Sequence, residues 1–173
     1  GYYGSGWMLE IDSNGNKKIE TNIDGNKYGY VFHSAVKTTT GYFVVGKNIY
    51  TKKGYIYQID KNGKVYKNSK IPWEICTGIK KVINLKNKGY IFAGDISYFG
   101  NGNSDVLIIR KDKNLKNKWI RFFGGGLNDN VESIIKLRNG NFLIVGYYSH
   151  YFKGAYRKKA WILKINDDGI KVD

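Results

Sequence analysis

Length, composition and charge already exclude several classes of protein. The 173-residue chain is 42% hydrophobic and 16% aromatic, which is enough apolar side chain for a core and excludes a disordered chain. Its net charge of +15 favours anionic partners, its single cysteine excludes an internal disulfide, and no apolar run approaches the roughly 20 residues of a membrane span.

The first recognisable segment, 7–15, reads Trp-Met-Leu-Glu-Ile-Asp-Ser-Asn-Gly, and a second follows at 17–21. Before them, Gly1-Tyr2-Tyr3 matches Gly146-Tyr147-Tyr148, so we expect residue 1 to be the last residue of a strand. Both segments alternate polar and apolar residues or are apolar for a few positions. They lack a 3.6-residue period, which predicts strands rather than helices.

From residue 34 onward, four kinds of segment follow one another in a fixed order. A leading segment lies at 34–37, 81–85 and 133–137. A glycine-flanked segment of the type Gly-Tyr-Phe-Val-Val-Gly lies at 41–46, 89–94 and 141–146. The aspartate-ended segment of 7–15 returns at 55–63, 106–115 and 161–169, and the trailing segment of 17–21 returns at 64–67 and 118–123.

The repeat has the length of one four-stranded unit. Asp12, Asp60, Asp112 and Asn166 occupy the same place in it and recur at intervals of 48, 52 and 54 residues. Four short strands at such a period are typical of β-propeller blades. The sequence therefore predicts an all-β fold, a β-propeller or propeller fragment of four-stranded antiparallel blades, with about three and a half repeats. The predicted units are a partial blade at 1–33, blades at 34–80 and 81–132, and a partial blade at 133–173.

The turn after each aspartate-ended segment has its own chemistry. Three of the four copies carry a dipeptide that supplies the positive φ angles of a tight hairpin: Asn14-Gly15, Asn62-Gly63 and Asp168-Gly169. We expect Asp12, Asp60 and Asp112 each to end a strand and to accept a hydrogen bond from a backbone amide of the following turn.

These segments resemble the tandem propeller repeats of many bacterial and archaeal exported and cell-surface proteins. Those repeats have a Gly-aromatic-aliphatic-Gly strand, an aliphatic strand ending in Asp-x-x-Gly, and an aromatic strand ending in Phe-Gly-Gly. Trp119 and Phe123-Gly124-Gly125 match the last piece, whereas 22–25 and 71–73 depart from it. The resemblance covers nearly the whole chain. It implies an exported scaffold or adhesion-like module and brings no catalytic residues with it.

The predicted units do not add up to a closed ring, because propellers typically need four to eight blades. Open ends would expose strand edges that invite pairing with another chain. We therefore expect additional blades to come from the same longer polypeptide or from another copy of the chain.

Several sites that the residues suggest have a plainer explanation. Residues 12–16 start like a calcium loop, but the positions that need Gly and a bidentate acid hold Lys17 and Ile23. His33, His150 and Cys76 stand without the partners of a metal or catalytic site, and 124–126 lacks the Lys-Ser or Lys-Thr of a phosphate loop. The sequence thus predicts no catalytic, cofactor-binding or metal-binding residue, and no cofactor.

The connections between the glycine-flanked and aspartate-ended segments differ most among the copies. They cover 47–54, 95–105 and 147–159, on the side of the sheets opposite the tight turns. Variable loops on a rigid scaffold are where binding usually occurs, and aromatics among cations suit stacking on sugars or bases. An alternative is that these aromatics pack between blades. The predicted binding face consists of Tyr98, Phe99, Tyr148, His150, Tyr151, Phe152, Tyr156 and Arg157.

These observations favour a non-enzymatic binding or structural module, extracellular or at the cell surface, with a preference for an anionic polymer or a polysaccharide. One alternative is a lyase or hydrolase with a shallow site on the same face, whose acids would be drawn from Asp95, Asp105, Asp129 and Glu132. The other is a nucleic-acid binder that acts through charge alone, since no motif indicates specific nucleic-acid recognition.

Overall fold

The chain folds into short antiparallel strands, with one three-residue 3-10 helix (η1, Lys86–Lys88) in the described part. The computed structural model describes residues 6–23, 29–70, 76–97 and 104–173. The strands follow the order of the sequence segments, and we group them into repeats 1 to 4. Repeat 1 holds β1 (Gly6–Ile11) and β2 (Lys17–Ile23). Repeat 2 holds β3 (Tyr30–Lys37), β4 (Gly41–Asn48), β5 (Lys53–Asp60) and β6 (Val65–Lys70).

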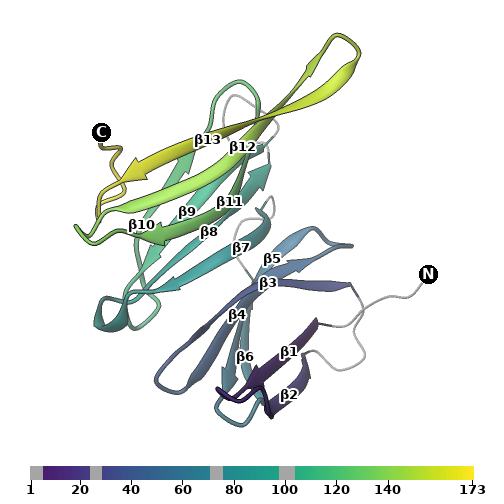
Figure 1. Ribbon diagram of the computed structural model, residues 1–173, viewed down its shortest axis with the longest axis vertical. Helices are drawn as coiled ribbons and strands as arrows, with labels where there is room; N and C mark the ends of the chain where they lie inside the picture. The colour runs from purple at the N-terminus through teal and green to yellow at the C-terminus, as the bar shows by residue number, and fades with distance from the viewer. Residues whose placement is uncertain (1–5, 24–28, 71–75, 98–103) are drawn as a thin grey trace.

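The second half of the chain follows the same plan (Figure 1). Repeat 3 holds β7 (Cys76–Asn84), β8 (Tyr90–Ser97), β9 (Ser104–Lys111) and β10 (Asn117–Phe123). Repeat 4 holds β11 (Asn128–Lys136), β12 (Phe142–Phe152) and β13 (Ala155–Ile165). Within each repeat, neighbouring strands pair antiparallel in chain order. Repeats 3 and 4 meet in one sheet through a single parallel pair, Asn128 with Ser104. The fold is all-β, and no sheet of the described residues closes on itself.

The repeats stack face to face, with an apolar layer between each pair. Because side chains alternate between the faces of a strand, the two faces of repeat 3 contribute to different layers. In β8, Phe92 packs toward repeat 2, while Ile91 packs toward repeat 4. In β9, Leu107 and Ile108 divide in the same way. A third layer between repeats 1 and 2 is formed by Met8, Val44, Tyr57 and Ile59.

The two outermost faces of this stack lack such a layer among the described residues. Ile11 of β1 is 55% exposed, although Ile59, at the same place in repeat 2, is fully buried. Ile162 of β13 is 72% exposed, although Ile108, its equivalent in repeat 3, is fully buried. Positions that carry apolar side chains for packing in the middle of the stack are therefore open to solvent at its ends.

The expected turn chemistry is confirmed at all three aspartates. Asp60 ends β5, and its Oδ1 accepts the amide hydrogens of Asn62 (2.9 Å) and Lys64 (2.8 Å). Asp12 and Asp112, each one residue past its strand, accept the corresponding pair of amides. Asn166 does the same in repeat 4, so the amide oxygen serves as well as the carboxylate.

Each of the strands β3, β7 and β11 contains a β-bulge, opposite the glycine of the sequence motif in the following strand. Phe32 and Ser34 pair with the adjacent residues Gly46 and Val45, which leaves His33 as the extra residue. Lys80 and Glu132 are extra residues in the same register in repeats 3 and 4. This bulge explains the repeated glycine: a Cβ at Gly46, Gly94 or Gly146 would overlap a carbonyl oxygen of the bulged strand.

Two parts of the structure differ from the expectations. The strands β3, β7 and β11 begin before 34, 81 and 133, because the bulge interrupts the alternation that marks a strand in the sequence. The predicted loop 147–159 is instead a paired hairpin made by the ends of β12 and β13. In the described residues, no helix has the length and apolar character needed to cross a membrane.

Candidate functional site

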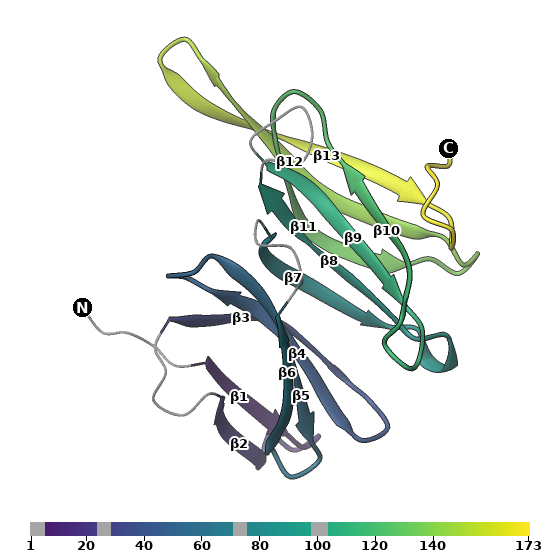
Figure 2. The same cartoon turned by 180° about the vertical axis from the view of Figure 1, so that it is seen from behind.

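The first candidate site is the hairpin of β12 and β13. The pairing of β12 with β11 ends at Ser149, but β12 and β13 remain paired as far as Phe152 and Ala155. The tip has positive φ angles at Lys153 (48°) and Gly154 (78°), as a two-residue hairpin turn requires. Figures 1 and 2 show this hairpin projecting beyond the stacked sheets.

Six of the eight residues of the predicted binding face lie on this hairpin, but they point to opposite sides. On one side, Tyr148, His150 and Phe152 form a ladder with ring centroids 5.9 Å and 6.2 Å apart, and Arg157 lies across from His150. On the other side, Tyr151 and Tyr156 meet edge to face at 5.2 Å. Tyr98 and Phe99 lie outside the described residues.

The outer part of the hairpin is open to solvent and basic. Tyr151 and Tyr156 are 65% and 76% exposed, so these rings do not pack between repeats. The Nζ of Lys158 lies 4.1 Å from the ring centroid of Tyr147, and the Nζ of Lys153 lies 5.4 Å from that of Phe152. No Asp or Glu occurs between residues 147 and 165, so nothing within the hairpin offsets its cations.

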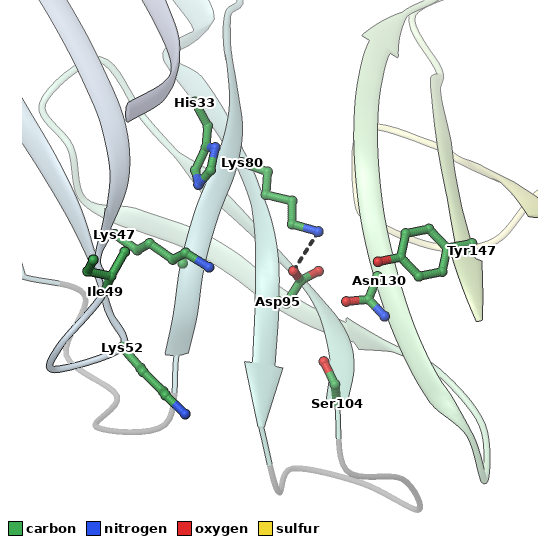
Figure 3. Close-up of a pocket in the computed structure, with 10 residues that line it drawn as sticks. His33, Lys47, Ile49, Lys52, Lys80, Asp95, Ser104, Asn130 and Tyr147 are labelled. Atoms are coloured by element: carbon green, nitrogen blue, oxygen red, sulfur yellow. Dashed lines mark ion pairs between the residues drawn. The ribbon is translucent and has the colours of Figure 1, made fainter. Parts of the chain in front are cut away.

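The second candidate site is a cavity of about 490 Å³ between repeats 2, 3 and 4. It lies on the side where β4, β8 and β12 end, the side that the sequence predicted for binding, yet of the predicted residues that the structure describes none lines it. Figure 3 shows its side chains converging from different sheets. The lining residues are His33, Lys47, Ile49, Lys52, Gly78, Lys80, Asp95, Ser104, Asn130 and Tyr147.

The cavity is built from equivalent positions of the repeat. His33 and Lys80 are the extra residues of the bulges in β3 and β7. Lys47, Asp95 and Tyr147 each follow the glycine that closes β4, β8 or β12 in the sequence motif. A β-bulge changes the direction of its extra side chain. Because the bulge occurs at the same position of the repeat, the redirected side chains lie at equivalent places in neighbouring sheets. The cavity therefore gathers side chains from two columns of the repeat whose residue type changes from copy to copy.

An ion pair of the partly buried Lys80 with the buried Asp95, both in repeat 3, forms the wall that faces repeat 4. Lys80 Nζ lies 2.8 Å from Asp95 Oδ2 and 3.6 Å from Glu132 Oε1. Asp95 Oδ1 accepts the amide hydrogen of Val131 at 2.9 Å. Burial raises the pKa of Asp95 against the opposing effects of Lys80 and the Val131 amide. Desolvation disfavours the charged form of Lys80, but Asp95 and Glu132 outweigh it and raise the pKa of the amine.

The wall formed by repeat 2 is positively charged and lacks a carboxylate. In the described part of the chain, neither Lys47 nor Lys52 makes an ion pair. Partial desolvation lowers the pKa of His33, and the charges of Lys47 and Lys80 lower it further, so its imidazole is neutral at pH 7. With Asp95 as the one acid among the lining residues, their net charge is +2.

The four acids of the enzyme alternative come together in two pairs. Asp95 and Glu132 share Lys80, as described above. Asp105 and Asp129 interact directly: burial raises the pKa of Asp105, and the charge of Asp129 raises it further. Asp105 Oδ2 is buried without a hydrogen-bond partner, whereas Asp129 Oδ2 accepts the amide hydrogen of Gly125 at 2.8 Å.

The surroundings of the other residues considered as candidates are as follows. Across residues 6–23, 29–70, 76–97 and 104–173, no three His, Cys, Asp or Glu side chains are grouped as metal ligands would be. Asp12 Oδ1 and Oδ2 are engaged by amides of its own turn. His150 belongs to the aromatic ladder, and Cys76 begins β7, with its side chain outside what the structure describes.

Sequence reasoning identified the hairpin residues and missed the cavity. Its signal was present in the sequence as the column of His33, Lys80 and Glu132 and the column of Lys47, Asp95 and Tyr147. Charged residues at repeat positions whose residue type changes from copy to copy were the available sign. The chain matches no protein-family model, and no curated protein is similar enough to count as a relative.

Proposed function

We propose that the repeats are blades of a β-propeller and that the chain acts as a non-enzymatic module that binds anionic, sugar-rich polymers through the hairpin of β12 and β13. In keeping with the resemblance to exported and surface repeats, we place its action outside the cell or on the cell surface. The observation that carries the binding proposal is the projecting hairpin, with its exposed aromatic rings among cations and no acid.

The blade assignment is supported by the way the sheets stack. Each inner sheet has an apolar layer on both faces, and each outer sheet keeps apolar residues on the face that lacks one. Burying one isoleucine stabilises a fold by roughly 1.5–3 kcal/mol, so Ile11 and Ile162 mark faces that gain from a further sheet. Additional blades, from a longer polypeptide or from another copy of the chain, would supply it.

The binding proposal is supported by the chemistry of the ladder side of the hairpin. The rings of Tyr148, His150 and Phe152 lie at roughly regular intervals along one strand, and Phe152 at the outer end is 49% exposed. Arg157 and Lys159 pair with His150 and Tyr148 across the hairpin and so share that side. Rings stack on sugar or base faces while the cations attract sulfate, carboxylate or phosphate groups.

The test is binding to heparin and polygalacturonate, with neutral dextran as the uncharged control, across a range of salt concentrations. The Arg157→Met, Lys159→Met variant should bind both anionic polymers about tenfold more weakly and show a salt slope smaller by about one per lost contact. The matched control is Lys61→Met, Lys64→Met, which removes the same charge from an exposed turn of repeat 2 and should bind as the unchanged chain does.

Three outcomes would contradict the proposal. An equal loss in the two variants would mean that net charge alone drives binding. Equal affinity for single-stranded DNA and for the polysaccharides would favour the nucleic-acid alternative. Cleavage of either polymer, abolished by Asp105→Asn or Asp95→Asn, would favour the enzyme.

A further inference from the structure

We propose that the cavity between repeats 2, 3 and 4 binds the anionic group of a small sugar acid or sugar phosphate. This site is distinct from the polymer-binding hairpin and does not depend on it. The inference rests on the charge balance of the cavity, on the way its lysines are held, and on its size and polar lining.

The charge balance favours an anion. The Asp95 carboxylate is already used, by Lys80 on one oxygen and by the Val131 amide on the other. Lys47 and Lys52 face the same space without a carboxylate partner in the described residues. A cavity with two uncompensated ammonium groups concentrates anions, because its low-dielectric walls focus their field.

Lys47 is held in place before any ligand arrives, and the turn that precedes the exposed Lys52 is fixed as well. The aliphatic stem of Lys47 lies over Gly78, where even a Cβ would come within 3.1 Å of it. Lys52 follows a turn that buried Asn48 organises, since Asn48 Oδ1 accepts the amide hydrogens of Tyr50 (3.0 Å) and Thr51 (2.9 Å). Part of the ordering that binding requires is therefore already complete, which lowers the entropy cost of binding.

The rest of the lining suits a hydroxylated body attached to the anion. Ser104, Asn130 and Tyr147 bring hydroxyl and amide groups to the wall opposite the lysines (Figure 3). A volume of about 490 Å³ is within the range of small-ligand sites and exceeds what a bare inorganic anion fills. A monosaccharide with one carboxylate or phosphate matches the size, the polarity and the charge.

The experiment is calorimetric titration of the 173-residue chain with glucuronate, with glucose 6-phosphate, with inorganic phosphate and with neutral glucose. We expect binding of glucuronate, of glucose 6-phosphate or of both, weaker binding of inorganic phosphate and none of glucose. The preference between the two sugar anions identifies a carboxylate or a phosphate as the recognised group. No binding of either sugar anion, or equal binding of glucose, would overturn the proposal.

The variants locate the site. Lys47→Met and Lys52→Met keep the aliphatic stems and should each weaken the preferred ligand about tenfold. The control Lys61→Met, Lys64→Met removes two charges elsewhere and should leave its affinity unchanged. If the control weakens the ligand as much as the cavity variants do, the anion is held by the general positive charge and the site is wrongly assigned.

A variant that removes a negative charge from the cavity, and so should raise the affinity for an anion, keeps the test decisive if the lysine variants fold poorly. Asp95→Asn retains an oxygen for the Val131 amide but removes the nearer of the two carboxylates that pair with Lys80, leaving only the exposed Glu132. We expect it to raise affinity several-fold for the preferred anion and not for glucose. Unchanged or weaker binding by a folded Asp95→Asn protein would contradict the proposal. Polymer binding by the hairpin should be unaffected, so the two proposals fail separately.

Discussion

Replacing Asp60 by alanine tests the physical basis of the repeat at its most regular point. Two amide hydrogens, those of Asn62 and Lys64, lose the oxygen that lies 2.9 Å and 2.8 Å from them. The turn lies at the surface, so water replaces part of what is lost. The loss of such a capping oxygen costs about 1–2 kcal/mol. In a chain of this length, that corresponds to a fall in Tm of roughly 2–8 °C.

The measurement is the free energy of unfolding in urea, followed by tryptophan fluorescence, for Asp60→Ala and Asp60→Asn side by side. Asn166 holds the equivalent turn of repeat 4 through its amide oxygen, with the amide nitrogens of Asp168 and Ile170 at 3.0 Å and 2.9 Å. Asp60→Asn should therefore lose less than about 0.5 kcal/mol. The reasoning is refuted if the asparagine variant is as unstable as the alanine variant, or if alanine costs nothing.

Three further changes probe packing and charge. Gly94→Ala should destabilise by roughly 3 kcal/mol, because the added methyl overlaps the Gly78 carbonyl oxygen; a loss below about 1 kcal/mol in urea unfolding would show that the bulge yields. Ile108→Ala should cost about 2–5 kcal/mol and Ile162→Ala less than about 0.5, and equal losses would mean that the outer face is covered in solution. Asp105→Asn should stabilise at pH 7 by roughly 1–3 kcal/mol, because it removes a buried charge with an unpaired oxygen. The raised pKa of Asp105 means that the folded state holds the Asp105 proton more tightly than the unfolded state does. The unchanged chain therefore loses stability as pH rises above the unfolded pKa near 3.8, and the gain from Asp105→Asn should vanish below that pH. A gain that persists below that pH would show that the buried charge of Asp105 is not its cause.

The order of strands and the chemistry of their turns could be predicted because both are local. An Asp-x-Asn-Gly turn specifies its own hydrogen bonds within five residues, and alternation over six residues specifies a strand. The all-β class and the antiparallel meander follow from these short-range signals together with the period of the repeat. How the sheets are arranged relative to one another depends on side chains about 50 residues apart, such as Trp119, whose Nε1 donates to the Asp167 carbonyl oxygen at 2.8 Å.

The hairpin of β12 and β13 was predicted as a loop because its sequence lacks the pattern of a half-buried strand. Its residues are polar, aromatic and basic, and none of them needs burial, so the pattern of a half-buried strand is missing. The pairing continues because Lys153 and Gly154 form a tight turn and because tyrosine and phenylalanine favour extended backbone. The sequence left open whether the aromatic rings are exposed or packed between repeats, and the register that distributes six candidate residues over two sides depends on the exact turn.

The two variable columns that form the cavity are visible in the sequence, but their convergence on one site is not, because it depends on the register between strands. A glycine near the end of a strand can have several structural causes. The bulge becomes visible only in the strand pairing, where Phe32 pairs with Gly46 and Ser34 pairs with the adjacent Val45. Once the bulge is known, two features have one cause. A backbone carbonyl oxygen of the bulged strand leaves no room for a Cβ at Gly46, Gly94 or Gly146. The extra residue of the bulge turns its side chain toward the neighbouring sheets. The backbone thus requires the glycine but leaves the displaced residue free to vary. His33, Lys80 and Glu132 therefore differ in chemistry, and two of them, His33 and Lys80, line the cavity.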